Sequence, residues 1–271
     1  MNVSSLSLFS RKSKETIRQS IHWFLNNPPS PKPRPNPKCH LAIDATWFGR
    51  KNCLLVYWDT DLKYIQRWRY TTSELSFEIA QDLFNLSEDG VIACSITSDG
   101  GRGIFRAVDM VYPNISHQRC VTHIQRLGLT LVTRNPKTLP GKELRPLVLT
   151  ITKIKTKQQK DAWTNEFMLW NKKWNYFLKE RTYLEGSTRW WYTHKYLRRV
   201  RALIVNAIPD LFYYLEDQLI PKDTNGLEGR FSSLKQHYRQ HRGLSKERRE
   251  TYLAWYVTVM FNKEKPTRFL Y

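Results

Sequence analysis

Between residues 41 and 70, three short runs rich in apolar residues predict three successive β-strands. The runs are LAIDATWF, CLLVYWDT and LKYIQRWRY, and the short polar turns between them are typical of a three-stranded meander. The next segment, TTSELSFEIAQDLFNL, has its apolar residues at helical spacing, and Ser73 is the expected N-cap. A continuous apolar strand, VIACSITS, follows, and after it come a helix in GIFRAVDMVY and a short strand in NISHQRC.

This order of elements, βββαβαβ, is that of an α/β domain with a mixed, RNase H-like sheet. The strand patterns end near residue 122, and helical stretches rich in Trp and Lys extend to residue 222. We interpret these stretches as an all-helical insertion into the RNase H-like catalytic domain. The domain then resumes near residue 223 with a helix that contains Glu228.

The N-terminal segment differs from the rest of the chain. Residues 10–26 have the apolar spacing of one helix, with Ser10 or Ser13 as its expected N-cap. This helix is similar to the second helix of a helix-turn-helix that is cut short, and a docking helix fits the pattern equally well. Six prolines between Pro28 and Pro37 then predict an extended, basic linker and a domain boundary near residue 38.

We therefore predict four segments along the chain. They are a partial helix-turn-helix-like segment with the Pro-rich linker at 1–38, the first part of the RNase H-like domain at 39–124, the helical insertion at 125–222, and the last part of the RNase H-like domain at 223–271.

The charge of the chain indicates its partner, because 44 Lys and Arg residues outnumber 24 acids and give a formal net charge of +20. Such an excess favours nucleic acid first and an anionic membrane surface second. No apolar run approaches the roughly 20 residues that a membrane span needs, and the N-terminus is too polar for a signal peptide. Four cysteines in a chain of this length do not form the pattern of a disulfide framework. We expect a cytoplasmic protein that binds double-stranded DNA and no membrane.

Two aspartates and one glutamate are the candidate catalytic residues. Asp44 lies midway along the first predicted strand, Asp99 at the carboxyl end of the fourth, and Glu228 on a helix. The two strands are neighbours in an RNase H-like sheet, so we expect the carboxylates to converge. Converging carboxylates repel one another unless a cation lies between them, and Mg²⁺ prefers oxygen ligands. We expect two Mg²⁺ ions roughly 4 Å apart, for which Mn²⁺ can substitute, to activate a water or hydroxyl and to stabilise the leaving 3′ oxygen.

The predicted helix that contains Glu228 also has a line of cations. Asn225 is its expected N-cap, and the positions at +4, +7, +11 and +14 from Glu228 share one face. These positions are Ser232, Lys235, Arg239 and Arg242. At 1.5 Å per residue this face extends roughly 21 Å, which suits a helix that lies along a DNA backbone. A solvated basic face on an amphipathic helix is the alternative interpretation.

The chain resembles the DDE transposases of the Mutator-like superfamily in Asp44, Asp99, the CVTH run at 120–123 and the TNGLEG run at 224–229. It is most similar to the bacterial insertion-sequence branch, whose longer members have an N-terminal zinc-binding segment. The stretches HQRCVTHIQRLGLTLVTRNPKTLPGKEL and TNGLEGRFSSLKQHYRQHRGLS are typical of that branch, and the resemblance covers roughly residues 40–260. The cysteine pairs expected of the zinc-binding segment are absent from the N-terminal part of this sequence.

The resemblance implies metal-dependent DNA strand cleavage at transposon ends, followed by transfer of the 3′ hydroxyl into target DNA. It also implies a homodimer or higher oligomer on DNA and a nucleoid-associated location in a prokaryotic cytoplasm. The alternative is a truncated or domesticated relative that binds DNA without catalysis. The short N-terminal segment favours this alternative, and the three intact acids oppose it.

The Cys-x-x-His motif lies beside the active site in the resembled family. The resemblance therefore implies that His123 supports the active site by positioning a phosphate, whereas Cys120 packs beside it. A satisfied core histidine is one alternative. A zinc site is another, and it needs two further ligands, which Cys39 and His40 could supply.

Three more residues are candidates for DNA binding. Arg102 follows a glycine-rich turn after Asp99, where the backbone can approach DNA closely, and we expect it to contact a phosphate. Trp190 and Trp191 lie in RWWYTHKYLRR, which combines aromatic and basic residues. They are either part of a small core or a platform that stacks on an unpaired base.

Overall fold

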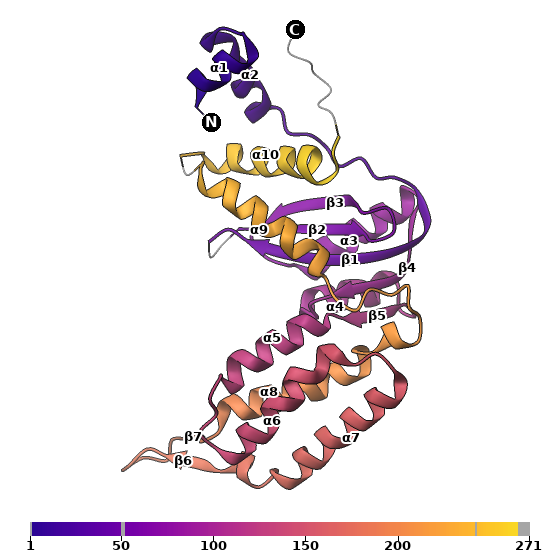
Figure 1. The fold of residues 1–271 in the computed structure, drawn as a ribbon, viewed down its shortest axis with the longest axis vertical. Helices are drawn as coiled ribbons and strands as arrows, with labels where there is room; N and C mark the ends of the chain where they lie inside the picture. The colour runs from indigo at the N-terminus through magenta and orange to yellow at the C-terminus, as the bar shows by residue number, and fades with distance from the viewer. Residues whose placement is uncertain (1, 50–51, 242, 265–271) are drawn as a thin grey trace. The chain divides into compact units, whose positions relative to one another are not determined.

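The structure is a computed structural model, and it describes residues 2–49, 52–241 and 243–264. The chain forms two compact units (Figure 1). Unit 1 contains residues 1–93 and 226–271, and unit 2 contains residues 94–225. The four segments expected from the sequence do not coincide with these two units, and their boundaries stay a prediction.

Unit 1 is built on the predicted antiparallel meander. Its strands are β1 (Asn36–Trp47), β2 (Cys53–Asp59) and β3 (Tyr64–Thr71). The register places Asp44 of β1 opposite Val56 of β2, and Ala42 opposite Trp58. Successive residues of a strand point to opposite faces of the sheet, whereas directly opposite residues of paired strands point to the same face, so Asp44 and Val56 share one face.

Two further strands complete the sheet. They are β4 (Val91–Ser98) and β5 (Ser116–Arg119), which pair in parallel with Ser98 beside Arg119. The strand order is β3-β2-β1-β4-β5. This order, with antiparallel and parallel pairs in one sheet, confirms the predicted mixed α/β fold of the RNase H-like type.

Helices α9 (Asn225–Arg239) and α10 (Lys246–Tyr256) cover one face of the meander, and a π-helical turn, Val257–Phe261, continues α10. Figure 1 shows α9 passing across the strands of the meander. Apolar side chains from the strands and from both helices form one core, whose buried members are Ala42, Phe48, Leu54, Val56, Ile65, Leu227, Phe231, Leu234, Leu253, Tyr256, Val257 and Phe261. This core fixes α9 against the sheet.

Helix α3 (Ser76–Glu88) packs beside the meander through a buried carboxylate. Asp82 has no exposed surface and accepts hydrogen bonds from Arg67 Nε at 2.6 Å, from Arg69 Nε and Nη2 at 2.7 Å, and from the Tyr57 hydroxyl at 3.0 Å. The expected N-cap, Ser73, is wrong. The helix begins after Leu75, which makes no side-chain capping hydrogen bond.

The N-terminal segment contains two helices, α1 (Val3–Ser10) and α2 (Lys14–Asn26). The prediction of one helix over 10–26 is wrong at its start, because Arg11 adopts a left-handed conformation and ends α1. Ser13, one of the two expected caps, is the N-cap of α2, and its side chain accepts a hydrogen bond from the Thr16 amide. The helix docks on α10, where Trp255 Nε1 donates to the carbonyl of Phe24 at 2.9 Å.

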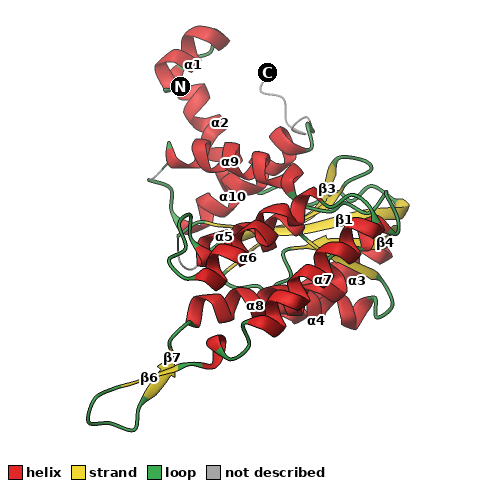
Figure 2. Ribbon diagram, turned by 60° about the horizontal axis from the view of Figure 1, so that its bottom comes forward, coloured by secondary structure: helices red, strands yellow, loops and turns green. Residues whose placement is uncertain are grey.

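Unit 2 is mainly helical (Figure 2). Its helices are α4 (Arg102–Val111), α5 (Val121–Val132), α6 (Leu139–Thr150), α7 (Lys157–Lys173) and α8 (Lys195–Ala207), with 3-10 turns at Ile151–Lys153, Phe177–Lys179, Ile208–Asp210 and Tyr213–Leu215. Its core packs residues such as Leu144, Phe167, Val200 and Leu211.

One element of unit 2 was not expected from the helical patterns. Strands β6 (Arg181–Tyr183) and β7 (Trp190–Tyr192) form a two-stranded hairpin, which projects from the helices in Figures 1 and 2. The rest of the predicted insertion is helical or irregular.

Candidate active site

Asp44 is the most buried of the three candidate acids. Its residue is 5% exposed, and the amide of Ala45 donates to its Oδ1 at 2.9 Å. Its neighbours on the same sheet face are Ala42 and, across the strand pair, Val56. Both belong to the core beneath α9 and α10. The carboxylate therefore lies on the sheet face that α9 covers.

Glu228 lies in the first turn of α9 and is half-buried. The start of this helix is held close to the sheet, because a Cβ added at Gly226 would lie 2.1 Å from the ring of Trp58. Trp58 shares the sheet face of Asp44, since it is two residues from Val56 on β2. Asp44 and Glu228 therefore lie on the same side of the meander in unit 1. The expected N-cap Asn225 is instead the first helical residue.

The contact between Gly226 and Trp58 predicts opposite outcomes for two glycines that flank Glu228. Gly229→Ala has nothing within 4 Å of the added Cβ. It is expected to raise the free energy of unfolding by up to about 1 kcal/mol through helix propensity. Gly226→Ala has the same local gain, but the added methyl collides with the Trp58 ring, and overpacking of this kind costs about 1–3 kcal/mol. Urea denaturation followed by circular dichroism measures both.

The two variants control for one another, because they make the same change in the same helix. If Gly226→Ala stabilised the protein as much as Gly229→Ala, α9 would not be in close contact with Trp58. The placement of Glu228 on the face of Asp44 would then lose its support.

Asp99 lies in unit 2, directly after β4. The amide of Gly101 donates to its Oδ1 at 2.8 Å, so the carboxylate caps the turn that follows. Gly100 has a φ of +85°, a conformation that L side chains rarely adopt, and this explains the glycine. Arg102 is the first residue of α4 and is exposed, which is compatible with the expected phosphate contact.

The Cys-x-x-His motif begins α5. Cys120 is buried and precedes the helix as its cap residue. Its Sγ accepts from the Thr224 amide at 3.4 Å, while the Val121 amide donates to the carbonyl of Lys222 at 3.0 Å. These contacts fasten the beginning of α5 to the segment that precedes α9, and the role of Cys120 beside an active site stays a prediction. His123 lies in the first turn of α5 and is partly exposed.

The basic line on α9 is shorter than predicted within the part of the chain that the structure describes. Lys235 is half-buried and Arg239 exposed, and the helix ends at Arg239. Arg242 lies outside the described residues. The expectation of a 21 Å helical face therefore does not hold to its far end, although two of its three cations are on α9.

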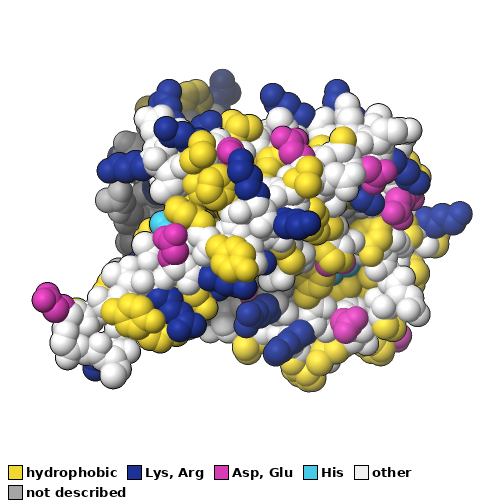
Figure 3. Space-filling model, turned by 90° about the horizontal axis from the view of Figure 1, so that it is seen from below, with side chains coloured by type: hydrophobic (Ala, Val, Ile, Leu, Met, Phe, Trp, Pro, Cys, Tyr) yellow, Lys and Arg dark blue, Asp and Glu magenta, His cyan; other side chains and the backbone are white. Residues whose placement is uncertain are grey.

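Trp190 and Trp191 are on the hairpin of unit 2. They are 41% and 48% exposed, so neither is a core residue. One face of the Trp190 ring is covered by the guanidinium of Arg181, whose Cζ lies 3.9 Å from the ring centroid. Tyr192 is held in the same way by Arg198 at 3.5 Å. The hairpin thus presents aromatic and basic side chains together. In Figure 3, hydrophobic side chains in yellow and basic side chains in dark blue lie next to one another on the surface.

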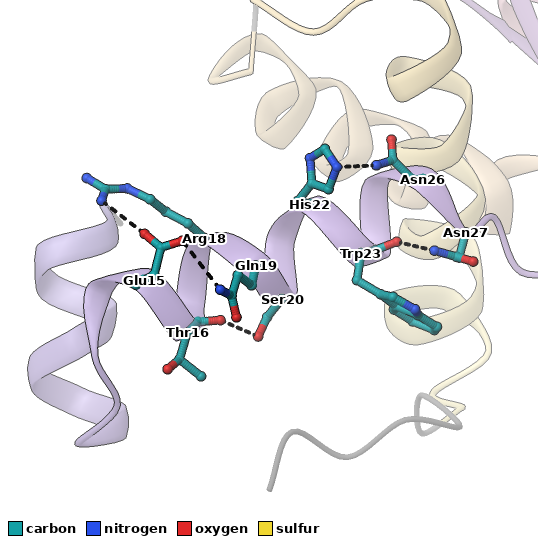
Figure 4. Close-up of a pocket in the computed structure, with 9 residues that line it drawn as sticks. All are labelled: Glu15, Thr16, Arg18, Gln19, Ser20, His22, Trp23, Asn26 and Asn27. Carbon is teal, nitrogen blue, oxygen red and sulfur yellow. Dashed lines mark hydrogen bonds and ion pairs between the residues drawn. The ribbon is translucent and has the colours of Figure 1, made fainter.

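A groove of about 670 Å³ follows α2 in unit 1, and Figure 4 shows its lining. The polar side chains along it are engaged with one another. Arg18 lies 3.7 Å from Glu15, and His22 Nε2 is 2.8 Å from Asn26 Nδ2. This face agrees with either interpretation of the N-terminal helix, as a DNA reader or as a docking helix.

The donors for a metal ion are divided between the two units. Asp44 and Glu228 belong to unit 1 and Asp99 to unit 2, so the convergence of all three stays a prediction. Among the described residues, no three His, Cys, Asp or Glu side chains form a group that could hold a metal ion. The zinc alternative at Cys120 and His123 also stays a prediction.

Sequence reasoning missed two features of the site. The first is the contact of Gly226 with Trp58, which joins a helix start to a strand far away in the chain. The second is Arg119, the last residue of β5, whose guanidinium lies against the turn after Asp99. The sequence offers no clear signal for Arg119, because a cation at the end of a strand is common.

One part of the chain matches a known protein family. A family model described as Transposase, Mutator family, matches residues 63–180. The matched range contains Asp99, Cys120 and His123, and it contains neither Asp44 nor Glu228. The match confirms the resemblance to this family and supports a transposase function with DNA as the partner. No curated protein matches the chain. No helix among the described residues is long and apolar enough to cross a membrane.

Proposed function

We propose that this chain, whose residues 63–180 match the Mutator family of transposases, cleaves DNA strands at transposon ends and joins the 3′ hydroxyl to target DNA. The family match carries the transposase function. The observation that favours catalysis by this chain is the placement of Asp44 and Glu228 on one face of unit 1, under a helix held against the sheet. An acid that had lost its role would not need to occupy a position that is 5% exposed in a strand.

The donor set fits Mg²⁺ or Mn²⁺ better than zinc. Asp44, Asp99 and Glu228 offer carboxylate oxygens only, which are the ligands of hard cations, whereas structural zinc prefers sulfur and nitrogen. Two bound Mg²⁺ ions would supply activation of the attacking oxygen and stabilisation of the leaving one. The chain's own part is to hold the carboxylates in place. β1 fixes Asp44, the Gly101 amide orients Asp99, and the Trp58 contact fixes the start of the Glu228 helix.

The DNA would be held by charge and by aromatic faces. Arg102 begins α4 immediately after the Asp99 turn, and Lys235 and Arg239 follow Glu228 along α9. We propose that these three residues contact phosphates, because guanidinium and ammonium groups position a duplex through its phosphates without reading its sequence. The exposed Trp190 and Trp191 are proposed to contact DNA from the hairpin.

His123 is proposed to support the active site by positioning a phosphate. The active form is proposed to be a homodimer or higher oligomer on DNA, located at the bacterial nucleoid.

The test of this function is a cleavage and joining assay with the full chain. The substrate is a supercoiled plasmid that carries the DNA flanking the coding region on both sides, incubated with Mg²⁺ or Mn²⁺. We expect nicks that leave 3′ hydroxyl ends at the borders of the flanking repeats, and products in which these ends are joined to a second plasmid. If the protein bound the DNA tightly but produced no cut with either metal, the chain would be a non-catalytic DNA-binding relative.

The role of α9 in DNA binding can be tested through salt. Each phosphate contact contributes about 0.9 to the slope of log K against log salt concentration. Replacing Lys235 and Arg239 together by alanine is therefore expected to flatten this slope by about 1.8. Fluorescence anisotropy with a duplex at several salt concentrations measures it. A matched variant, with exposed Lys157 and Lys172 of α7 replaced by alanine, removes the same charge. Equal flattening in both variants would show that α9 has no particular role.

A further inference from the structure

The end of β5 lies directly beside the turn that contains Asp99. Ser98 and Arg119 are register partners in the parallel pair β4–β5. The amide of Cys120 donates to the carbonyl of Ser98 at 2.7 Å, which extends the pairing to the last residue of β4. The backbone of Arg119 is therefore fixed next to the point where the chain leaves the sheet toward Asp99.

The side chain of Arg119 lies against the backbone of this turn. Its Nη2 donates to the carbonyl of Gly100 at 3.4 Å, and its Nη1 donates to the carbonyl of Asn206, near the end of α8, at 3.2 Å. A Cβ at Gly100 would lie only 2.2 Å from Nε. That Nε is buried and has no hydrogen-bond partner among the described residues, so it meets Gly100 by packing alone. The guanidinium thus links the turn to α8.

The charge of Arg119 acts on the same turn. Burial lowers the pKa of the guanidinium, and the nearby carboxylates of Asp210 and Asp99 act in the opposite direction. A cation that is attracted to Asp99 adds to the hydrogen bond from the Gly101 amide, so two separate interactions restrain this carboxylate. The guanidinium is directed toward two protein carbonyls, those of Gly100 and Asn206.

We propose that Arg119 is a positioning residue, which holds the turn at 99–101 so that the Asp99 carboxylate is pre-arranged to bind the metal ion. The proposal rests on the proposed function of Asp99 as a metal ligand. A side chain that only fastened α8 to β5 would need the bond to Asn206, but not the contacts with Gly100. Pre-arrangement matters because a ligand fixed before binding loses less conformational entropy when the metal arrives.

The first test examines the turn without metal. Arg119→Lys keeps the charge and loses the planar fork that reaches both carbonyls. Hydrogen–deuterium exchange of the backbone amides at 98–103, followed by mass spectrometry on the full chain, is expected to become at least about tenfold faster, because the guanidinium's hydrogen bond to the Gly100 carbonyl is lost. The remaining peptides of unit 2 are expected to exchange as before. Unchanged exchange at 98–103, or an equal rise throughout unit 2, overturns the proposal.

The second test measures the metal itself. In calorimetric titration of the DNA-free protein with Mn²⁺, Arg119→Lys is expected to weaken the affinity by about tenfold, in the range typical of residues that orient a metal ligand. Arg106→Lys, an exposed arginine on α4, is the matched control and should leave the affinity unchanged. Unchanged affinity in Arg119→Lys overturns the positioning role.

A further variant covers the case in which Arg119→Lys does not fold. Gly100→Ala disturbs the same contact from the other side, through its positive φ and its collision with Nε. It is expected to give the same local rise in exchange and the same loss of Mn²⁺ affinity, and it overturns the proposal if it gives neither. Asp99→Asn separates this proposal from the proposed function. If that variant bound Mn²⁺ as well as the original protein, the metal role of Asp99 would fail, whatever Arg119 does.

Discussion

Replacement of Asp44 by asparagine is expected to abolish DNA strand cleavage while DNA binding stays intact or becomes tighter. Asparagine has nearly the same shape, so the strand and its core are retained. It lacks the negative charge that a divalent ion needs, and loss of a direct ligand should exceed the 10–100-fold loss typical of outer residues, giving a fall of more than about 100-fold. Binding should not suffer, because the variant removes a negative charge near phosphates. Plasmid nicking with Mg²⁺ and anisotropy with a duplex measure the two properties.

The matched control for this variant is Asp89→Asn, at the end of α3. Asp89 is exposed, and the hydrogen bonds that end α3 there are made by the backbone and not by its carboxylate. Both variants change the net charge of unit 1 by the same amount. We expect full cleavage from Asp89→Asn. Cleavage by Asp44→Asn at the original rate would remove Asp44 from the site, and loss of folding in Asp44→Asn, detected by circular dichroism, would attribute the effect to structure.

Replacement of Asp82 by alanine is expected to lower the free energy of unfolding by about 3 kcal/mol, at the lower end of the range for breaking a buried ion pair. The carboxylate has no exposed surface and accepts from two arginines and from Tyr57. Without it, two guanidinium groups and a hydroxyl lose their partner. The side chains of Arg67 and Arg69 are 22% and 29% exposed, so water relieves part of the penalty, which is the reason for the lower value. Urea denaturation measures the change.

Two further variants separate charge from volume at this position. Asp82→Asn keeps the shape of the side chain and can still accept a hydrogen bond. We therefore expect it to lower the free energy of unfolding by most, but not all, of the amount expected for Asp82→Ala. Glu88→Ala, at an exposed position of the same helix, is expected to change stability by less than about 0.5 kcal/mol. A loss for Asp82→Ala no larger than for Glu88→Ala would show that the cluster contributes nothing to the docking of α3.

The strands and long helices could be predicted because they are buried, the strands as short apolar runs and the helices through apolar residues at helical spacing. In the meander, Leu54 and Val56 belong to the core under α9, and the strand around them is a continuous apolar run that is buried on both faces. The hairpin β6–β7 could not be predicted in this way. Arg181, Tyr183 and Trp190 are all exposed, so the hairpin has no buried apolar face whose pattern would indicate strands. Contacts between its own side chains hold it, such as Arg181 over the Trp190 ring and the hydroxyl pair of Thr182 and Thr193 at 2.8 Å.

In the candidate site too, some residues could be predicted from the sequence and others could not. An acid in a strand interior, such as Asp44, conflicts with its local pattern and is visible in the sequence for that reason. The same is true of Glu228, where a carboxylate precedes cations at helical spacing. Arg119 and Trp58 conflict with nothing local, because a cation at a strand end and an aromatic residue in a strand are both common. Their importance arises from what they touch, Gly100 and Gly226, and only the three-dimensional structure supplies that.

The contacts of Cys120 with Thr224 and of Val121 with Lys222 have a consequence for how this protein can change during evolution. They hold the two ends of the segment 121–222 side by side, so this mainly helical segment is a cassette whose first and last residues are neighbours. Chain segments of this kind can grow, shrink or be exchanged with little effect on the rest, because the entropy of closing a loop changes only slowly with its length. Relatives could therefore differ widely in the size of this cassette while the sulfur and carbonyl that fasten its base stay the same.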